Sequence, residues 1–159
     1  MRHPLRTLIA LGGVLASLMG GLAVAQDKPA DNMEVLREKL RADKKAVVAE
    51  VLQLTEGEAK AFWPVYNAYQ SDMVSHYDRV LKLLETYASS YETMTDATAT
   101  SLLKQYLGLE RDHVALLTSY LPRFQKVLPP KKVAKLYQVE NKARALVNYE
   151  LARGIPLVK

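Results

Sequence analysis

The fold is decided by the stretch LTEGEAKAFWPVYN, residues 54–67, because a weaker copy, LPPKKVAKLYQVEN, follows at residues 128–141. Both copies begin with a leucine and a helix-start signal, and both carry an apolar-aromatic pair about two helical turns later. The matching positions are Leu54, Phe62 and Trp63 in the first copy and Leu128, Leu136 and Tyr137 in the second. This internal repeat predicts an all-helical protein built from two related halves.

The two copies start their helices by different chemistry. Thr55 and Glu58 form a capping-box sequence, in which each side chain accepts a hydrogen bond from the backbone N–H of the other residue. In the second copy, Pro130 can occupy the first helical turn, where a missing N–H is harmless. Pro64 falls inside the helix of the first copy and cannot donate to the Lys60 carbonyl. We therefore expect a kink there, or a short helix that restarts at Pro64.

Outward from the repeat, apolar residues recur every three or four positions and predict four helices. The expected helices are residues 32–54, residues 55–88, residues 96–125 with an N-cap at Thr95, and residues 130–153 with Gly154 directly after the last turn. No segment alternates with period two, so we expect no strands. The predicted fold class is all-α, with four long, kinked helices in a curved hairpin or bundle. It forms a single domain over residues 32–154, followed by a C-terminal tail at residues 155–159.

Residues 1–25 read as a cleavable signal peptide. Two arginines give a basic start, an apolar run follows, and Ala23-Val24-Ala25 supplies the small-residue pattern of a signal peptidase site. The alternative is a membrane anchor, but the apolar run is shorter than a helix needs to span a bilayer. We therefore expect a periplasmic protein without a stable membrane anchor, in which residues 26–31 form a flexible lead.

The composition excludes several classes of chemistry. Without cysteine, the chain has no disulfide, no thiolate metal site and no lipid-modified cysteine. Removing residues 1–25, which carry two arginines and no acidic residue, lowers the formal net charge from +5 to +3. That charge is too mild to indicate nucleic-acid binding. No Gly-x-Ser-x-Gly elbow or glycine-rich phosphate loop is present, so we expect neither a cofactor nor enzymatic activity.

The nine tyrosines lie mostly on the apolar faces of the expected helices. A tyrosine buries a large ring while keeping a hydroxyl for a polar edge, so each one can belong to the core. Together they exceed what a thin helical layer can bury, which leaves a homodimer interface or a client-binding face as alternatives. The candidate client-binding residues are Tyr69, Met73, Tyr77, Tyr106 and Tyr120.

Glu110 and His113 form a Glu-x-x-His spacing that places both side chains on one helix face, as in metal-binding helical bundles. If the second and third helices pair antiparallel, Asp72 and His76 would complete a four-residue metal site. The alternative is that both histidines are half-buried core residues, because each lies in or beside an apolar stripe. We expect the second arrangement, with no bound metal.

The segment Leu54-Thr55-Glu56-Gly57-Glu58 resembles the first LTxxQ motif of the Spy/CpxP family of exported helical proteins, with Glu58 in place of the glutamine. At residues 128–132, where the second motif would fall, only Leu128 matches. Four helices after a signal peptide also agree with the family. The resemblance implies a curved architecture of long helices, often an intertwined homodimer. It also implies a periplasmic role as an ATP-independent chaperone or as a stress- or metal-responsive adaptor.

The sequence thus favours an exported, non-enzymatic helical protein that binds unfolded or envelope proteins, as a chaperone or an envelope-stress adaptor does. Two alternatives stay open. One is an interaction module for a single folded envelope partner, and the other is a metal-responsive regulator that uses His76 and His113. The departures from the family motif at Glu58 and in the second copy allow a separate branch with another role.

Overall fold

The computed structural model describes residues 42–158, and within them the chain is helical with no strand. The first helix within the described residues, called the first helix below, covers residues 42–52. The remaining elements are α3 (Glu56–Ser90), the short 3₁₀ helix η2 (Tyr91–Thr93), α4 (Asp96–Gln125) and α5 (Pro130–Gly154). The prediction of an all-α fold is confirmed. The expected signal peptide, the lead at residues 26–31, residues 32–41 of the first expected helix and Lys159 lie outside the described residues.

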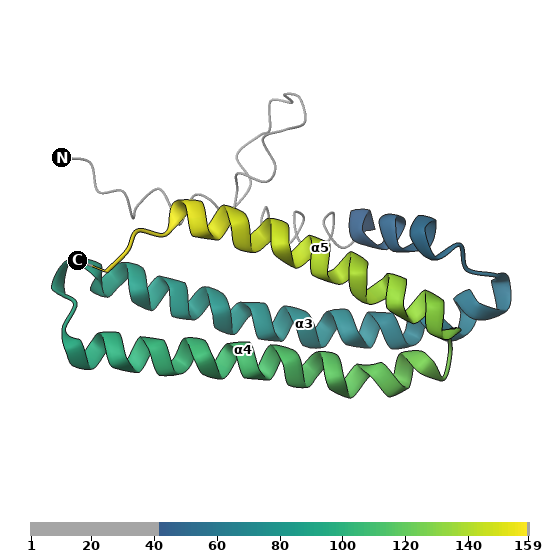
Figure 1. The fold of residues 1–159 in the computed structure, drawn as a ribbon, viewed down its shortest axis with the longest axis horizontal. Coiled ribbons are helices and arrows are strands. Elements are labelled where there is room, and N and C mark those ends of the chain that lie inside the picture. Colours follow the sequence, from purple (N-terminus) through teal and green to yellow (C-terminus); the bar gives the residue numbers. More distant parts are fainter. Residues whose placement is uncertain (1–41, 159) are drawn as a thin grey trace, which may run out of the picture.

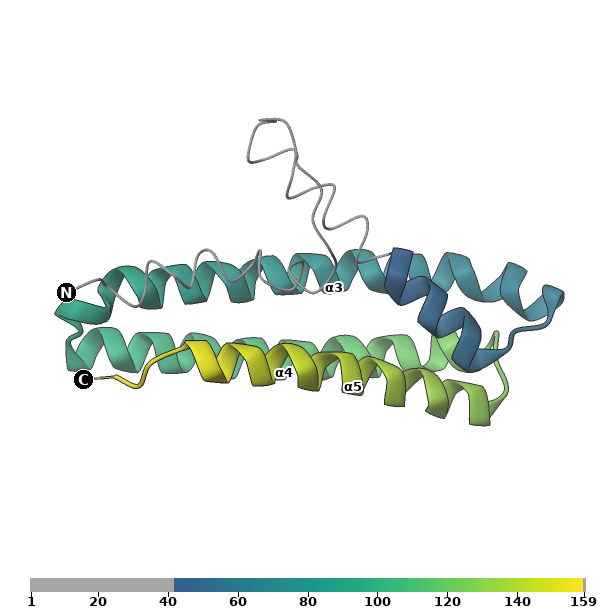
Figure 2. The same ribbon diagram turned by 90° about the horizontal axis from the view of Figure 1, so that it is seen from above.

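The three long helices form an elongated bundle (Figure 1). α3 and α4 lie side by side and antiparallel, with η2 at the turn between them, and α5 runs in the same direction as α3. The first helix lies over the half of the bundle where α5 begins (Figure 2). From that half onward α5 diverges from α4, so α4 forms one long edge of the molecule (Figure 1).

The first helix ends at residue 52, two residues earlier than expected, because Gln53 adopts a left-handed conformation with φ of 47°. The Gln53 N–H donates to the Ala49 carbonyl at 3.0 Å, which closes the helix with a left-handed C-cap. Thr55 then caps α3 as predicted. Its hydroxyl accepts from the Glu58 N–H at 3.3 Å, and the Glu58 carboxylate accepts from the Thr55 N–H at 2.8 Å. The capping-box prediction is confirmed, and the connection takes only residues 53–55.

The expected restart at Pro64 does not occur, because α3 continues through Pro64 as one helix. Pro64 and Lys60 are both exposed. The Lys60 carbonyl that loses its partner therefore lies on the solvent side of α3, where water can bond to it. A proline on the solvent-facing side of a packed helix therefore lowers the stability of the fold less than a proline that faces the core.

Three of the four predicted ends of α4 and α5 are correct, including the end of α4 at Gln125. The Thr95 hydroxyl caps α4 by accepting from the Thr98 N–H at 3.1 Å, and Pro130 is the first residue of α5. Gly154 was expected just after α5, but it is the last residue of the helix. The reason is that the Ile155 N–H still donates to the Leu151 carbonyl, at 2.9 Å. The helical hydrogen-bond pattern therefore continues past Gly154.

The two copies of the repeated segment lie at the starts of α3 and α5, with equivalent positions in contact. Lys132 Nζ donates to the Glu58 carboxylate at 2.6 Å, and the Tyr66 hydroxyl donates to the Glu140 carboxylate at 3.1 Å. Both pairs are 74 residues apart, which is the offset that relates the two copies. The repeat therefore aligns α3 and α5 in register where both helices begin.

The apolar core fills the half of the bundle that the first helix covers. Full burial of one large apolar side chain contributes about 1.5–3 kcal/mol to stability. The core side chains come from every segment and are Val48, Leu52, Phe62, Tyr66, Tyr69, Met73, Tyr120, Phe124, Leu128, Val133 and Leu136. Toward the opposite end, the buried apolar residues of the described range are Tyr91 and Leu102. None of the helices within residues 42–158 is long and apolar enough to span a membrane.

Candidate functional site

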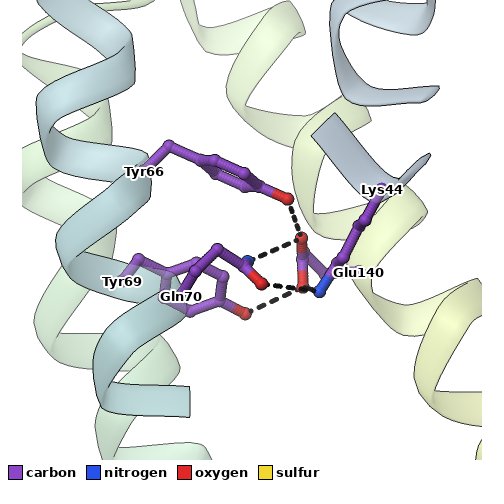
Figure 3. A network of polar contacts seen from close by, with 5 residues as sticks. All are labelled: Lys44, Tyr66, Tyr69, Gln70 and Glu140. Carbon is purple, nitrogen blue, oxygen red and sulfur yellow. Dashed lines mark hydrogen bonds and ion pairs between the residues drawn. The ribbon is translucent and has the colours of Figure 1, made fainter. Parts of the chain in front are cut away.

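A buried carboxylate ties three helices together (Figure 3). Glu140 of α5 is only 8% exposed. Its Oε1 accepts from the Tyr66 hydroxyl at 3.1 Å and from the Gln70 amide at 3.4 Å. Its Oε2 accepts from the Tyr69 hydroxyl at 3.2 Å and from the Lys44 ammonium at 2.7 Å. Because Lys44 belongs to the first helix, this network fixes that helix against α3 and α5.

The partners of Glu140 leave its carboxylate saturated. Burial raises the pKa of Tyr66 and of Tyr69, and the negative charge of Glu140 raises both further. The two tyrosines therefore stay protonated and act only as donors. Glu140 follows the core residue Leu136 by about one helical turn, which places the carboxylate on the buried face of α5. A carboxylate held in this way positions helices and has no free oxygen with which to accept a proton from a substrate.

A pocket of about 280 Å³ adjoins the network and is bounded by α3, α4 and α5. Its lining residues are Tyr69, Met73, Tyr77, His113, Leu117, Tyr137, Glu140, Asn141 and Arg144. The volume lies at the low end of the range for small-molecule sites. Both charged lining residues are paired within the chain, Glu140 with Lys44 at 2.7 Å and Arg144 with Glu110 at 2.6 Å. The wall is therefore mostly aromatic and aliphatic, and each of its charges is compensated.

His113 contributes to this wall a side chain whose buried Nδ1 lacks a hydrogen-bond partner within the described residues. Its side chain is 3% exposed, and its Nδ1 forms no hydrogen bond within the described part of the chain. Burial lowers the pKa of His113 to about 4, with smaller contributions from Arg144 and His76, so the ring is neutral at neutral pH. A buried nitrogen without a partner costs about 1–3 kcal/mol.

The neighbouring histidine has a similar environment. The rings of His76 and His113 lie 5.4 Å apart between centroids, and the Arg79 guanidinium lies 3.4 Å from Nδ1 of His76. Burial, and then the positive charge of Arg79, lower the pKa of His76. The prediction that both histidines are core residues agrees with their burial, since His76 is also buried.

The alternative four-residue metal site is not assembled. His76 and His113 meet, but the Glu110 carboxylate accepts from an arginine of α5 at 2.6 Å, and the Asp72 carboxylate accepts from the Tyr120 hydroxyl at 2.6 Å. Within residues 42–158, no group of three or more potential ligands gathers. The carboxylates are held by stronger local partners, and the guanidinium groups beside the histidines oppose a cation.

Four of the five candidate client-binding residues do not form an exposed face. Tyr69, Met73 and Tyr120 are buried in the core, and Tyr77 is half-buried in the pocket wall. The helical periodicity selected them because they lie on the faces that α3 and α4 pack against their neighbours, and packing alone satisfies that pattern. Of the five, Tyr106 is the one with an exposed side chain.

A different apolar surface runs along the exposed side of α4. We define this α4 face by four side chains that are between 36% and 58% exposed, namely Leu103, Leu107, Val114 and Leu121. Their spacings of four and seven residues are close to whole helical turns, so they share one side of α4 over about 27 Å. Lys104 and Arg111 are exposed beside this face, and neither forms an ion pair with another residue between 42 and 158.

The sequence-based interpretation missed the α4 face because a stronger apolar stripe on the same helix supplies the core. The stripe through Leu102, His113 and Tyr120 explains the helical periodicity without reference to a second face. The seven-residue spacing of Leu107, Val114 and Leu121 was the available signal, because such a spacing is typical of a helix that packs against another helix.

Comparisons with protein-family models, with curated proteins and with solved structures gave no match to this chain. The fold and its surfaces therefore define only a structural class. The protein is a small helical bundle with a saturated polar network, a pocket between three helices and an apolar face on α4.

Proposed function

We propose that this protein is an exported, non-enzymatic binding protein that holds apolar segments of unfolded or envelope proteins on its α4 face. It acts in the periplasm, as an ATP-independent chaperone or an envelope-stress adaptor does. The observation that carries the proposal is the row of exposed Leu103, Leu107, Val114 and Leu121 along one edge of the bundle. Exposed apolar side chains that gather on one side of an element, rather than scatter singly, mark an interaction surface.

The shape and charge of the face define its occupant. A row of about 27 Å matches an amphipathic helix of about five turns. Lys104 and Arg111 border the row, so acidic residues flanking the apolar side of the occupant would add electrostatic attraction. The proposed partner is therefore a segment that is apolar on one side and acidic at its edges, which α4 meets in a helix-on-helix arrangement.

The size of the face favours reversible binding. Each exposed leucine or valine can bury only its remaining exposed surface, at about 25 cal/mol per Å², and association costs several kcal/mol in lost freedom of motion. A contact of this size captures and releases its partner without an energy source. This behaviour fits a protein that shields segments transiently.

The test is the aggregation of a chemically denatured client protein, followed by light scattering without nucleotide. The wild-type chain should delay aggregation, and Leu107→Asp should weaken that effect because it places a charge inside the row. Leu146→Asp is the matched control. Leu146 is 69% exposed on α5, two residues after Arg144, and lies on the opposite side of that helix from the pair that Arg144 makes with α4. Equal activity of the two variants, both folded, would remove the α4 face from the proposal.

A further inference from the structure

The pocket beside Glu140 has a polar feature that the fold itself does not use. The hydrogen bonds of the network saturate Glu140, and the Tyr137 hydroxyl donates to the Leu117 carbonyl at 2.7 Å. His113 differs, because its Nδ1 is buried and has no partner within the described residues. His113 lines the pocket, although its Nδ1 is itself closed off from solvent. Buried polar atoms in proteins are almost always paired, so an unpaired nitrogen on a pocket-lining ring points to a partner that arrives from outside the chain.

We propose that this pocket binds a small, uncharged aromatic molecule that carries a hydroxyl group, with the hydroxyl paired to His113. A hydroxyl both donates and accepts, so it suits a neutral imidazole nitrogen in either tautomer. The nitrogen turns toward the ligand by rotation about the Cβ–Cγ bond, a torsion with broad minima. This pocket is separate from the α4 face. The proposed ligand binding does not depend on the function proposed for the α4 face.

The side chains that line the pocket favour an aromatic ring as the apolar part of the ligand. Rings of Tyr69, Tyr77 and Tyr137 offer edges and faces to an aromatic ring, and Met73 adds a polarisable thioether. Leu117 closes the α4 side with an aliphatic surface. A volume of about 280 Å³ accommodates one small ring system, below the size of a typical drug-like ligand.

The charges around the pocket explain why the ligand is neutral. Arg144 is neutralised by Glu110 at 2.6 Å, and Glu140 is neutralised by Lys44 at 2.7 Å. An anion or a cation would lose its hydration on entry without finding a free counter-charge. The neutral state of His113 at neutral pH agrees with an uncharged partner.

The experiment is a titration of the full chain with phenol, toluene and benzoate, followed by calorimetry and by the ¹⁵N shifts of the histidine rings. Phenol and toluene have similar shapes and differ in the hydroxyl. We expect saturable one-site binding of phenol with a shift of the His113 ring nitrogens. Toluene should bind roughly five-fold more weakly because it cannot form the hydrogen bond. Benzoate should bind more weakly than phenol.

Three variants locate the site. Leu117→Trp fills the pocket and should abolish binding, whereas the matched Thr118→Trp adds the same indole at an exposed position of α4 and should leave binding unchanged. His113→Phe should keep toluene binding and remove the preference for phenol. If His113→Phe does not fold, the tryptophan pair still decides the location. The proposal is overturned if the wild-type chain shows no saturable phenol binding, if Leu117→Trp binds phenol normally, or if benzoate binds more tightly than phenol.

Discussion

The Tyr66 hydroxyl donates a 3.1 Å hydrogen bond to Glu140, and these two residues occupy the same position in the two copies of the repeated segment. The pair between Glu58 and Lys132 repeats this relationship two turns earlier. Equivalent positions have thus become complementary, a hydroxyl facing a carboxylate and an acid facing a base. The repeat does more than start two helices, because it supplies the polar contacts that fix α3 and α5 in register.

Replacing Glu140 with glutamine should destabilise the fold. The Glu140→Gln variant removes the charge that Lys44 meets at 2.7 Å and weakens two buried tyrosine hydrogen bonds. We expect a loss of about 2–4 kcal/mol in the free energy of unfolding, measured by urea denaturation.

The matched control for this prediction is Glu150→Gln, which removes a carboxylate from an exposed pair with Arg153 on the same helix. An exposed pair contributes little, so the change should be within about 0.5 kcal/mol. If the two variants lose the same stability, the network around Glu140 does not hold the first helix in place.

The capping box at the start of α3 predicts a smaller effect. Thr55→Ala removes the side-chain acceptor for the Glu58 N–H and should cost about 1 kcal/mol. Thr100→Ala, at an exposed position inside α4, removes a hydroxyl from a helix interior, where alanine is the better helix former. Thermal or urea unfolding should therefore separate the two variants, and equal stabilities would argue against a role for the cap.

His113 predicts a pH dependence of stability. Its pKa is about 4 in the folded chain and about 6.5 in an unfolded one, so unfolding takes up a proton between these values. The contribution is fully present above about pH 6.5 and is lost as the pH falls toward 4, by up to about 1.4 kcal/mol per pH unit. The difference in unfolding free energy between the wild type and His113→Gln should follow this course. A ring titration observed by NMR near pH 6.5 would contradict it.

The starts of α3, α4 and α5 were predictable because they depend on local chemistry. The Thr55 capping box, the Thr95 cap and Pro130 each act within a single turn of the chain, and each is found as predicted. The effect of Pro64 was not predictable in the same way. Whether a proline interrupts a helix depends on which side faces solvent, and that depends on tertiary packing.

The candidate site was less predictable because burial is a property of the assembled bundle. Tyr69, Met73 and Tyr120 lie on buried helix faces, whereas Tyr106, on the same predicted stripe as Tyr120, is exposed. The sequence does not say which faces other helices cover. Tyr69 and Met73 are covered, whereas Leu107 and Val114 are not. The buried carboxylate of Glu140 was missed for the same reason, since its partners come from segments about 70 and 96 residues away.

The most direct test of the proposed function is the affinity of the chain for a fluorescent amphipathic peptide that is apolar on one side and acidic at its edges, measured by anisotropy. The wild type should bind it saturably, and Leu146→Asp should bind within about two-fold of the wild type. Val114→Asp, at the middle of the α4 face, should weaken binding at least about ten-fold, or about 1.4 kcal/mol. A folded Val114→Asp variant that binds the peptide as tightly as the wild type would contradict the account.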